Sequence, residues 1–112
     1  MVPILLLSGL LLTAAQSDPI SQPRKAYSSC VKQLMNSSLD KKLDAAAFES
    51  ALASNCASQE QSFRAAIVKQ QLAMKASKKD AEQAATDWVG DQQLNATEMY
   101  KEYLDTGTRP DI

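Results

Sequence analysis

Residues 45–75 read AAAFESALASNCASQEQSFRAAIVKQQLAMK, and this stretch decides the fold. At 100° per residue its apolar side chains fall along one line of a helix, and neither glycine nor proline interrupts the run. The pattern predicts one unbroken amphipathic helix from Ala45 to Lys75. Its core-facing stripe consists of Ala45, Phe48, Leu52, Cys56, Phe63, Ile67 and Met74.

The later half of the stretch carries a second apolar face. Ala65, Val68 and Leu72 lie opposite the stripe, at positions where the earlier turns carry polar side chains. This pattern predicts burial on two sides near the end of the helix. A third helix would cover that face, or another subunit would. We therefore predict contact with a protein partner or a second copy of the chain through Ala65, Val68 and Leu72.

Flanking segments also show helical spacing. Tyr27, Cys30, Val31, Leu34 and Met35 recur at three and four residues, which predicts a helix over 24–37. Because Pro is tolerated in a first turn, Pro23 suits the start of this helix. The residues before it, 18–23, are predicted to be a flexible leader.

A third helix is predicted to begin at Ser77 and to bury alanines and Trp88. Gly90 leaves open one bent helix or two, with Asn95 as the cap of the second. Gly107 and Pro110 end the helical pattern, so 107–112 is predicted to be a disordered tail. No strand signal competes. The chain is therefore predicted to be all-α, a small bundle of three to four helices within 24–106.

The N-terminus has the pattern of an export signal. Residues 4–12 read ILLLSGLLL, and small residues follow, with cleavage after Ala15 or after Ser17. The apolar run is well short of the roughly 20 residues that a membrane span needs. We therefore predict that residues 1–17 are a cleaved secretory signal peptide. No stable membrane insertion is expected after cleavage.

Cys30 and Cys56 are the two cysteines of the exported chain. In an oxidising compartment an even number of cysteines favours a structural disulfide, here one that joins the first two helices as an antiparallel hairpin. Two free thiols, or a disulfide between chains, are the alternatives.

Charge and residue types exclude several functions. Twelve basic against 13 acidic residues give a net charge of −1, which offers no attractive field for nucleic acid. The chain contains no histidine, so a Cys-His pair, a Ser-His-Asp triad and His-bearing zinc sites are excluded. No catalytic residue, metal or cofactor is predicted. The acid pairs of the third helix, Asp87 with Asp91 and Glu98 with Glu102, are interpreted as a solvated face.

The segment from Cys56 to Arg64 places a cysteine, an acid, an aromatic and an arginine together. On a helix, Glu60 and Arg64 stand four residues apart in the order that favours an ion pair, while Phe63 faces the core. The segment is therefore interpreted as scaffold. Asn36 and Asn95 begin triplets that match the glycosylation acceptor pattern, which matters only in a eukaryotic secretory pathway.

Tyr27-x-x-Cys30 on a first helix, followed by Cys56-x-x-x-Glu60 on a second after an export signal, resembles small uncharacterised periplasmic two-cysteine helical proteins of proteobacteria. The resemblance implies a periplasmic location and a structural disulfide. It carries no activity to transfer.

The leading functional hypothesis is a non-catalytic interaction or structural module of the cell envelope, secreted to the periplasm, or outside the cell if the source is eukaryotic. One alternative is a carrier of a small apolar ligand, which predicts a cavity between helices lined by Phe48, Phe63, Ile67 and Met74. A secreted inhibitor or toxin-type protein is the other.

Overall fold

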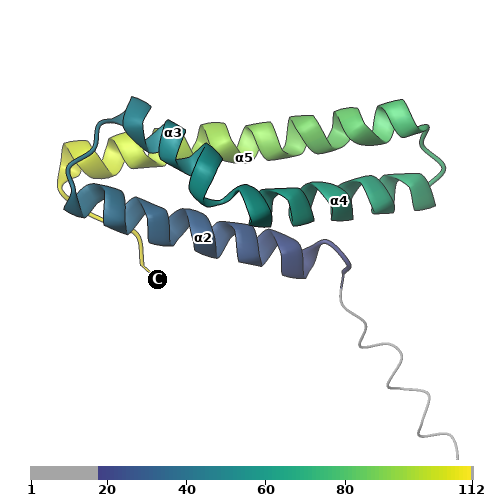
Figure 1. The fold of residues 1–112 in the computed structure, drawn as a ribbon, viewed down its shortest axis with the longest axis horizontal. Helices are drawn as coiled ribbons and strands as arrows, with labels where there is room; N and C mark the ends of the chain where they lie inside the picture. The colour runs from purple at the N-terminus through teal and green to yellow at the C-terminus, as the bar shows by residue number, and fades with distance from the viewer. Residues whose placement is uncertain (1–17, 112) are drawn as a thin grey trace, which may run out of the picture.

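The computed structural model describes residues 18–111, and the predicted signal peptide at 1–17 lies outside them. The described residues form α2 (Ser21–Asp40), α3 (Ala45–Asn55), α4 (Ala57–Ala73) and α5 (Lys78–Thr106), with no strand among them. Figure 1 shows α5 running along the whole bundle, with α3 and α4 following one another beside it and α2 below. The all-α prediction is confirmed.

Helix α2 begins earlier than predicted. The backbone N–H of Ile20 donates to the Asp18 carboxylate at 3.0 Å, and the helix starts at Ser21. The Ile20 side chain is 1% exposed, so burial holds the start of the helix in place. The prediction of a flexible leader over 18–23 is therefore wrong from Ile20 onward. Pro23 lies in the first turn, where its missing N–H costs nothing.

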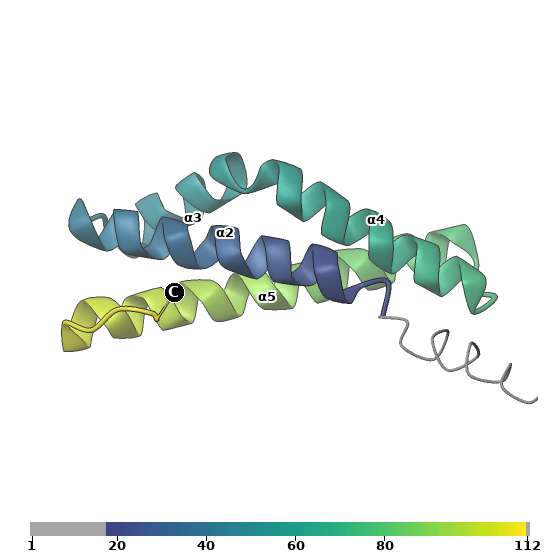
Figure 2. The ribbon, with the colours of Figure 1, turned by 90° about the horizontal axis from the view of Figure 1, so that it is seen from below.

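The predicted unbroken helix over 45–75 is also wrong, because the chain bends at Cys56. The backbone of Cys56 has φ −110° and ψ 20°, so α3 ends before it and α4 begins after it. Ser54 and Asn55 both donate side-chain hydrogen bonds to the Ala51 carbonyl, which compete with the helical backbone pattern. Figure 2 shows the resulting bend between α3 and α4.

The disulfide is formed, with a Cα–Cα distance of 5.9 Å between Cys30 and Cys56. It joins the middle of α2 to the bend between α3 and α4. The prediction of an intrachain bond between the first helical segments is thus confirmed, and free thiols and an interchain bond do not apply to this structure.

Helix α5 is one element, which settles the choice that Gly90 left open. It continues for 29 residues, about 43 Å at 1.5 Å per residue. A mid-helix glycine costs roughly 0.5–1 kcal/mol relative to alanine. Val89 is fully buried next to Gly90, so contacts with the rest of the bundle hold this part of α5 in place despite that cost.

Both N-terminal caps that the sequence predicted, at the starts of α3 and α5, are present in the structure. The Asp44 carboxylate accepts from the Ala47 N–H at 2.8 Å, and the Ser77 hydroxyl accepts from the Asp80 N–H at 3.1 Å. Gly107 ends α5 with φ 73°, as predicted.

Two other helix ends use lysine where glycine is usual. Lys42 after α2 has φ 55° and Lys75 after α4 has φ 74°. In both places the chain returns two hydrogen bonds to the last turn, and this satisfies carbonyls that the helix leaves unpaired.

The aromatic side chains of the core lie in two groups. Phe48 of α3 stacks on Tyr100 of α5, with ring centroids 4.3 Å apart. Farther along the bundle, Phe63 of α4 contacts both Tyr27 of α2 and Trp88 of α5, at 5.9 and 5.8 Å. These pairs tie α3 to α5 at one end, and α2, α4 and α5 in the middle.

The predicted disordered tail returns to the bundle. The Arg109 guanidinium donates to the Asp40 carboxylate at 2.9 Å and to the Asn36 side chain at 3.2 Å. Pro110 is buried. The prediction for 107–112 is therefore wrong over 107–111. Spacing within the tail could not show this, because the contact partners lie on α2.

Candidate functional site

The predicted contact face lies on α4 and is partly covered. Val68 is partly buried and packs against the core. Ala65 is exposed, and the Leu72 side chain retains 45% of its surface. Val68 is therefore partly covered by the core, whereas Ala65 and Leu72 are open to solvent.

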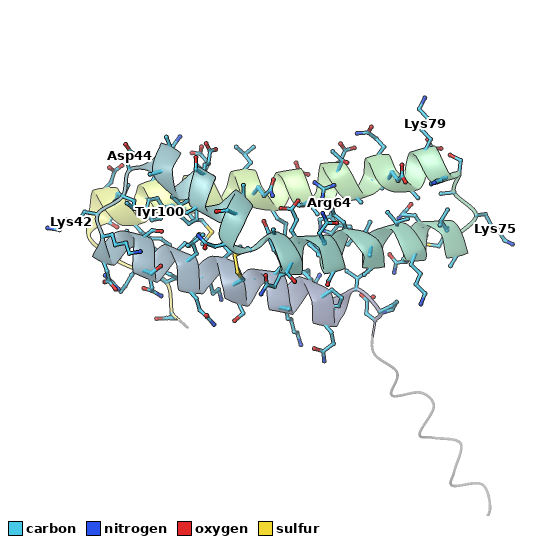
Figure 3. All side chains as sticks on the ribbon, viewed as in Figure 1. Lys42, Asp44, Arg64, Lys75, Lys79 and Tyr100 are labelled. Carbon is cyan, nitrogen blue, oxygen red and sulfur yellow. A yellow bond between two sulfur atoms is a disulfide. The ribbon has the colours of Figure 1, made fainter. Side chains whose placement is uncertain are left out.

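A further apolar side chain is exposed where α4 ends. Met74, which the sequence pattern placed in the core stripe, is 66% exposed. Figure 1 shows the reason: α4 and α5 extend beyond the start of α2, so at this end they form a two-helix tip. Figure 3 shows Lys75 and Lys79 at the same tip. We call Ala65 and Leu72, which share one side of the helix, the α4 surface; Met74 points from the opposite side.

A partly buried polar cluster joins α4 to α5. The Glu60 carboxylate accepts from the Arg64 Nε and from the Gln93 amide, both at 2.9 Å. Arg64 also donates to the Thr86 hydroxyl at 3.3 Å. Figure 3 shows Arg64 between the two helices. The ion pair was predicted from its spacing, but Gln93 and Thr86 were not, because their place depends on the register between α4 and α5.

Tyr27 of α2 reaches the same region from the other side. Its ring is buried against Phe63, and its hydroxyl has no hydrogen-bond partner among residues 18–111. Burial raises the pKa of Tyr27 above its usual value, and the nearby Glu60 charge adds to this, while Gln93 and Arg64 act in the opposite direction. The phenol therefore stays neutral at physiological pH.

The predicted acidic face is present on the solvent side of α5. Asp87, Asp91, Glu98 and Glu102 are all exposed, in agreement with a solvated face. Asp87 accepts from the Gln83 amide at 2.9 Å, and Glu98 pairs with Lys101 at 3.4 Å. Because α5 is unbroken, the two acid pairs form one acidic stripe.

An apolar groove lies between α2 and α5, but its lining differs from the predicted cavity. Its volume is about 120 Å³, and Pro110 closes one side of it. Phe48, Phe63 and Ile67 are instead fully buried in the core, and Met74 is exposed. The groove is lined mainly by Tyr27, Val31, Met35, Ala96 and Met99.

Neither a membrane-spanning helix nor a group of metal ligands is found within residues 18–111. Within this range no helix is long and apolar enough to cross a membrane. Nor does this part of the chain bring three or more Cys, Asp or Glu side chains together in a group that could hold a metal ion.

Comparison of the chain with protein-family models, with curated proteins and with solved structures gave no match. Function is therefore inferred from the chain's own residues.

Proposed function

We propose that the chain is a secreted, non-catalytic interaction module of the cell envelope that binds a protein partner through the α4 surface. The observation that carries this proposal is the exposure of Ala65 and of Leu72, which is 45% exposed, on one side of α4 in a crosslinked helical scaffold. Exposed apolar side chains that lie together are typical of protein contact sites. Secretion is supported by the Cys30–Cys56 disulfide and by the export pattern of 1–17.

The geometry favours a preformed contact site. The disulfide fixes the α3–α4 bend against α2, and the Glu60, Arg64 and Gln93 contacts fix α4 against α5. A partner that binds a rigid surface loses less conformational entropy than one that must order it. The α4 surface is small, so the module is expected to bind one or two apolar anchors of a partner.

The test is affinity capture of the exported, oxidised protein from its native envelope, with wild type, Leu72→Asp and Leu104→Asp side by side. Leu104 is 40% exposed on α5 and gives a matched control away from the α4 surface. We expect a bound chain that Leu72→Asp releases and Leu104→Asp retains. Equal capture by all three proteins would contradict the proposal.

A second copy of the chain is one possible partner. Sedimentation of the oxidised protein over a range of concentrations separates this case from a different protein. Concentration-dependent dimerisation that Leu72→Asp abolishes would identify the partner as a second copy. The proposal would be contradicted if the protein is a strict monomer, captures no other chain and behaves the same with Leu72→Asp.

The α2–α5 groove supports a second candidate function, a carrier of a small apolar ligand. Its lining is apolar, but its volume of about 120 Å³ is below the roughly 300–1,000 Å³ of ordinary ligand sites. A carried molecule would therefore be about as small as one ring. Mass spectrometry of the purified protein tests this: a copurified small apolar molecule whose removal lowers the melting temperature supports the carrier, and unchanged melting counts against it.

A further inference from the structure

A second groove runs between α3 and α5, away from the α4 surface. Its volume is about 350 Å³. Figure 1 shows α3 beside α5, with α2 below both helices. The groove is lined by Glu49, Leu52 and Ala53 of α3 and by Gly90, Leu94 and Thr97 of α5.

Two positions on the floor of this groove carry little or no side chain. Gly90 has no side chain, and a Cβ placed there would meet no atom within 4 Å. Packing inside the chain therefore does not require glycine at this position. Ala53 stands across the groove with a single methyl group. The backbone of a second element can approach closely at such a place, as in helix-in-groove recognition.

Leu94 stands beside this floor and is 62% exposed, so its side chain is free to contact a partner. Asp91 and Glu98 lie three residues before and four residues after Leu94, in a neighbouring hollow that Leu94 also lines, and Glu49 lines the groove itself. All three acids are exposed. Lys101 pairs with Glu98 at 3.4 Å, but both side chains are more than half exposed, so this pair offsets little of the negative charge.

We propose that the α3–α5 groove docks a cationic amphipathic helix of a partner protein. Its apolar residues would pack on Gly90, Ala53 and Leu94, and its lysines or arginines would face Glu49, Asp91 and Glu98. A second copy of this chain does not fit the groove, because a symmetric contact would place the same acids against one another. The inference rests on the proposed interaction function but assigns the partner's contact to a different surface.

The probe is a synthetic peptide about 14 residues long, built of leucine and lysine with the leucines on one helical face. A peptide with glutamate in place of lysine is its control. Binding to the oxidised full-length protein is measured by fluorescence anisotropy and mapped by amide chemical shifts. We expect the lysine peptide to bind, the glutamate peptide not to bind, and the shifts to centre on Gly90 and Leu94.

Three variants sharpen the test. Gly90→Leu adds a side chain to the floor, at a position where a Cβ meets no atom within 4 Å, and Asp91→Lys reverses one flanking charge. Glu82→Lys is the matched charge control, because Glu82 is exposed on α5 about 13 Å from Asp91 at the helical rise. We expect Gly90→Leu and Asp91→Lys each to weaken binding about tenfold and Glu82→Lys to change it little.

Several results would overturn the inference. These are no binding of the lysine peptide, equal binding of the glutamate peptide, equal weakening by Asp91→Lys and Glu82→Lys, or shifts centred on Leu72 and Met74. The far-ultraviolet circular dichroism of each variant checks that it is folded, and Asp91→Lys keeps the test valid if Gly90→Leu is not.

Failure of this inference is distinguishable from failure of the proposed function. If the captured native partner is released by Leu72→Asp but held equally by Gly90→Leu and Asp91→Lys, the interaction function stands and the groove assignment is wrong. If Asp91→Lys releases the partner and Leu72→Asp does not, the result would support binding at the groove and contradict binding at the α4 surface.

Discussion

The two ends of α5 are packed in different ways. Toward its C-terminus, Tyr100 stacks on Phe48 of α3, and its hydroxyl donates to the Leu43 carbonyl at 2.7 Å. Toward its N-terminus, α5 buries the small side chains Ala81 and Ala85. Figure 3 shows Tyr100 at one end of the bundle and Lys75 and Lys79 at the other.

This difference shows which end of the fold gains more stability from buried apolar area. Burial of large aromatic side chains stabilises the aromatic end, because apolar area removed from water grows with side-chain size. The alanines of the tip allow two helices to lie close together but contribute less buried area. Apolar side chains stay exposed at both ends: Leu72 and Met74 at the tip, and Met99 and Leu104 near Tyr100.

The largest expected effect is at the aromatic end. Phe48→Ala should lower the free energy of unfolding by about 3–5 kcal/mol, because it leaves a cavity beside Tyr100. Leu72→Ala at the tip should change it by less than about 0.5 kcal/mol, since that side chain is half exposed. Urea unfolding of the oxidised proteins measures both values. Similar losses for the two variants would erase the contrast between the ends.

Loss of the disulfide is expected to have the next largest effect. Cys30 and Cys56 close a loop of 26 residues, which corresponds to about 3.5 kcal/mol on the chain-entropy model. The double variant Cys30→Ser, Cys56→Ser should therefore melt at least about 10 °C lower. Wild type under reducing conditions is the control and should have the same melting temperature as the variant. A melting temperature unchanged by reduction would show that packing alone holds α2 on the α3–α4 bend.

The two buried tyrosines should respond differently to loss of the hydroxyl. Tyr100→Phe removes the hydrogen bond to the Leu43 carbonyl and should cost about 1 kcal/mol. Tyr27→Phe removes a hydroxyl that has no partner and should be neutral or slightly stabilising. Urea unfolding at pH 7 compares the pair. A larger loss for Tyr27→Phe would mean that its hydroxyl is bonded in solution.

The same two tyrosines make the stability of the folded protein depend on pH. Burial raises the pKa of both Tyr27 and Tyr100, so the folded protein holds these protons more tightly than the unfolded chain. Their stabilising effect is complete below about pH 10 and is lost as the pH rises through the raised values. Tyr27→Phe should therefore reduce the loss of stability above about pH 10. An unchanged alkaline unfolding curve would contradict this.

The smallest effect concerns the two lysines with positive φ. Lys75→Gly and Lys42→Gly should each stabilise the protein by about 0.5–1 kcal/mol, because glycine adopts this conformation without steric cost. Lys41→Gly is the matched control: Lys41 has φ −88°, so glycine there should destabilise slightly. Thermal melts compare the three. Stabilisation by Lys41→Gly as well would show that the effect is not conformational.

Much of the fold could be predicted because helices depend on local spacing. The stripe of residues 45–75, the caps Asp44 and Ser77 and the terminator Gly107 all act within a few residues of the chain. The bend at Cys56 was missed because the apolar stripe continues in register across it. Met74 was misplaced for a related reason: spacing shows which face is apolar but not how far a neighbouring helix extends.

The candidate surfaces were less predictable than the helices. Ala65 and Leu72 could be recognised as a second face, yet only the packing of the helices shows that Val68 is partly covered and the other two are open. The α3–α5 groove gave no sequence signal, since Ala53 and Gly90 lie 37 residues apart in the printed sequence and on different helices.

Sequence by itself determined the helical class, the cap residues, the Glu60–Arg64 pair and the choice of cysteines that could bond. Tertiary packing was needed to decide the continuity of α5 through Gly90, the docking of the tail by Arg109, and which apolar side chains stay exposed. The physical reason is range: periodicity and capping act over three or four residues, whereas coverage depends on the register between helices that are distant in the chain.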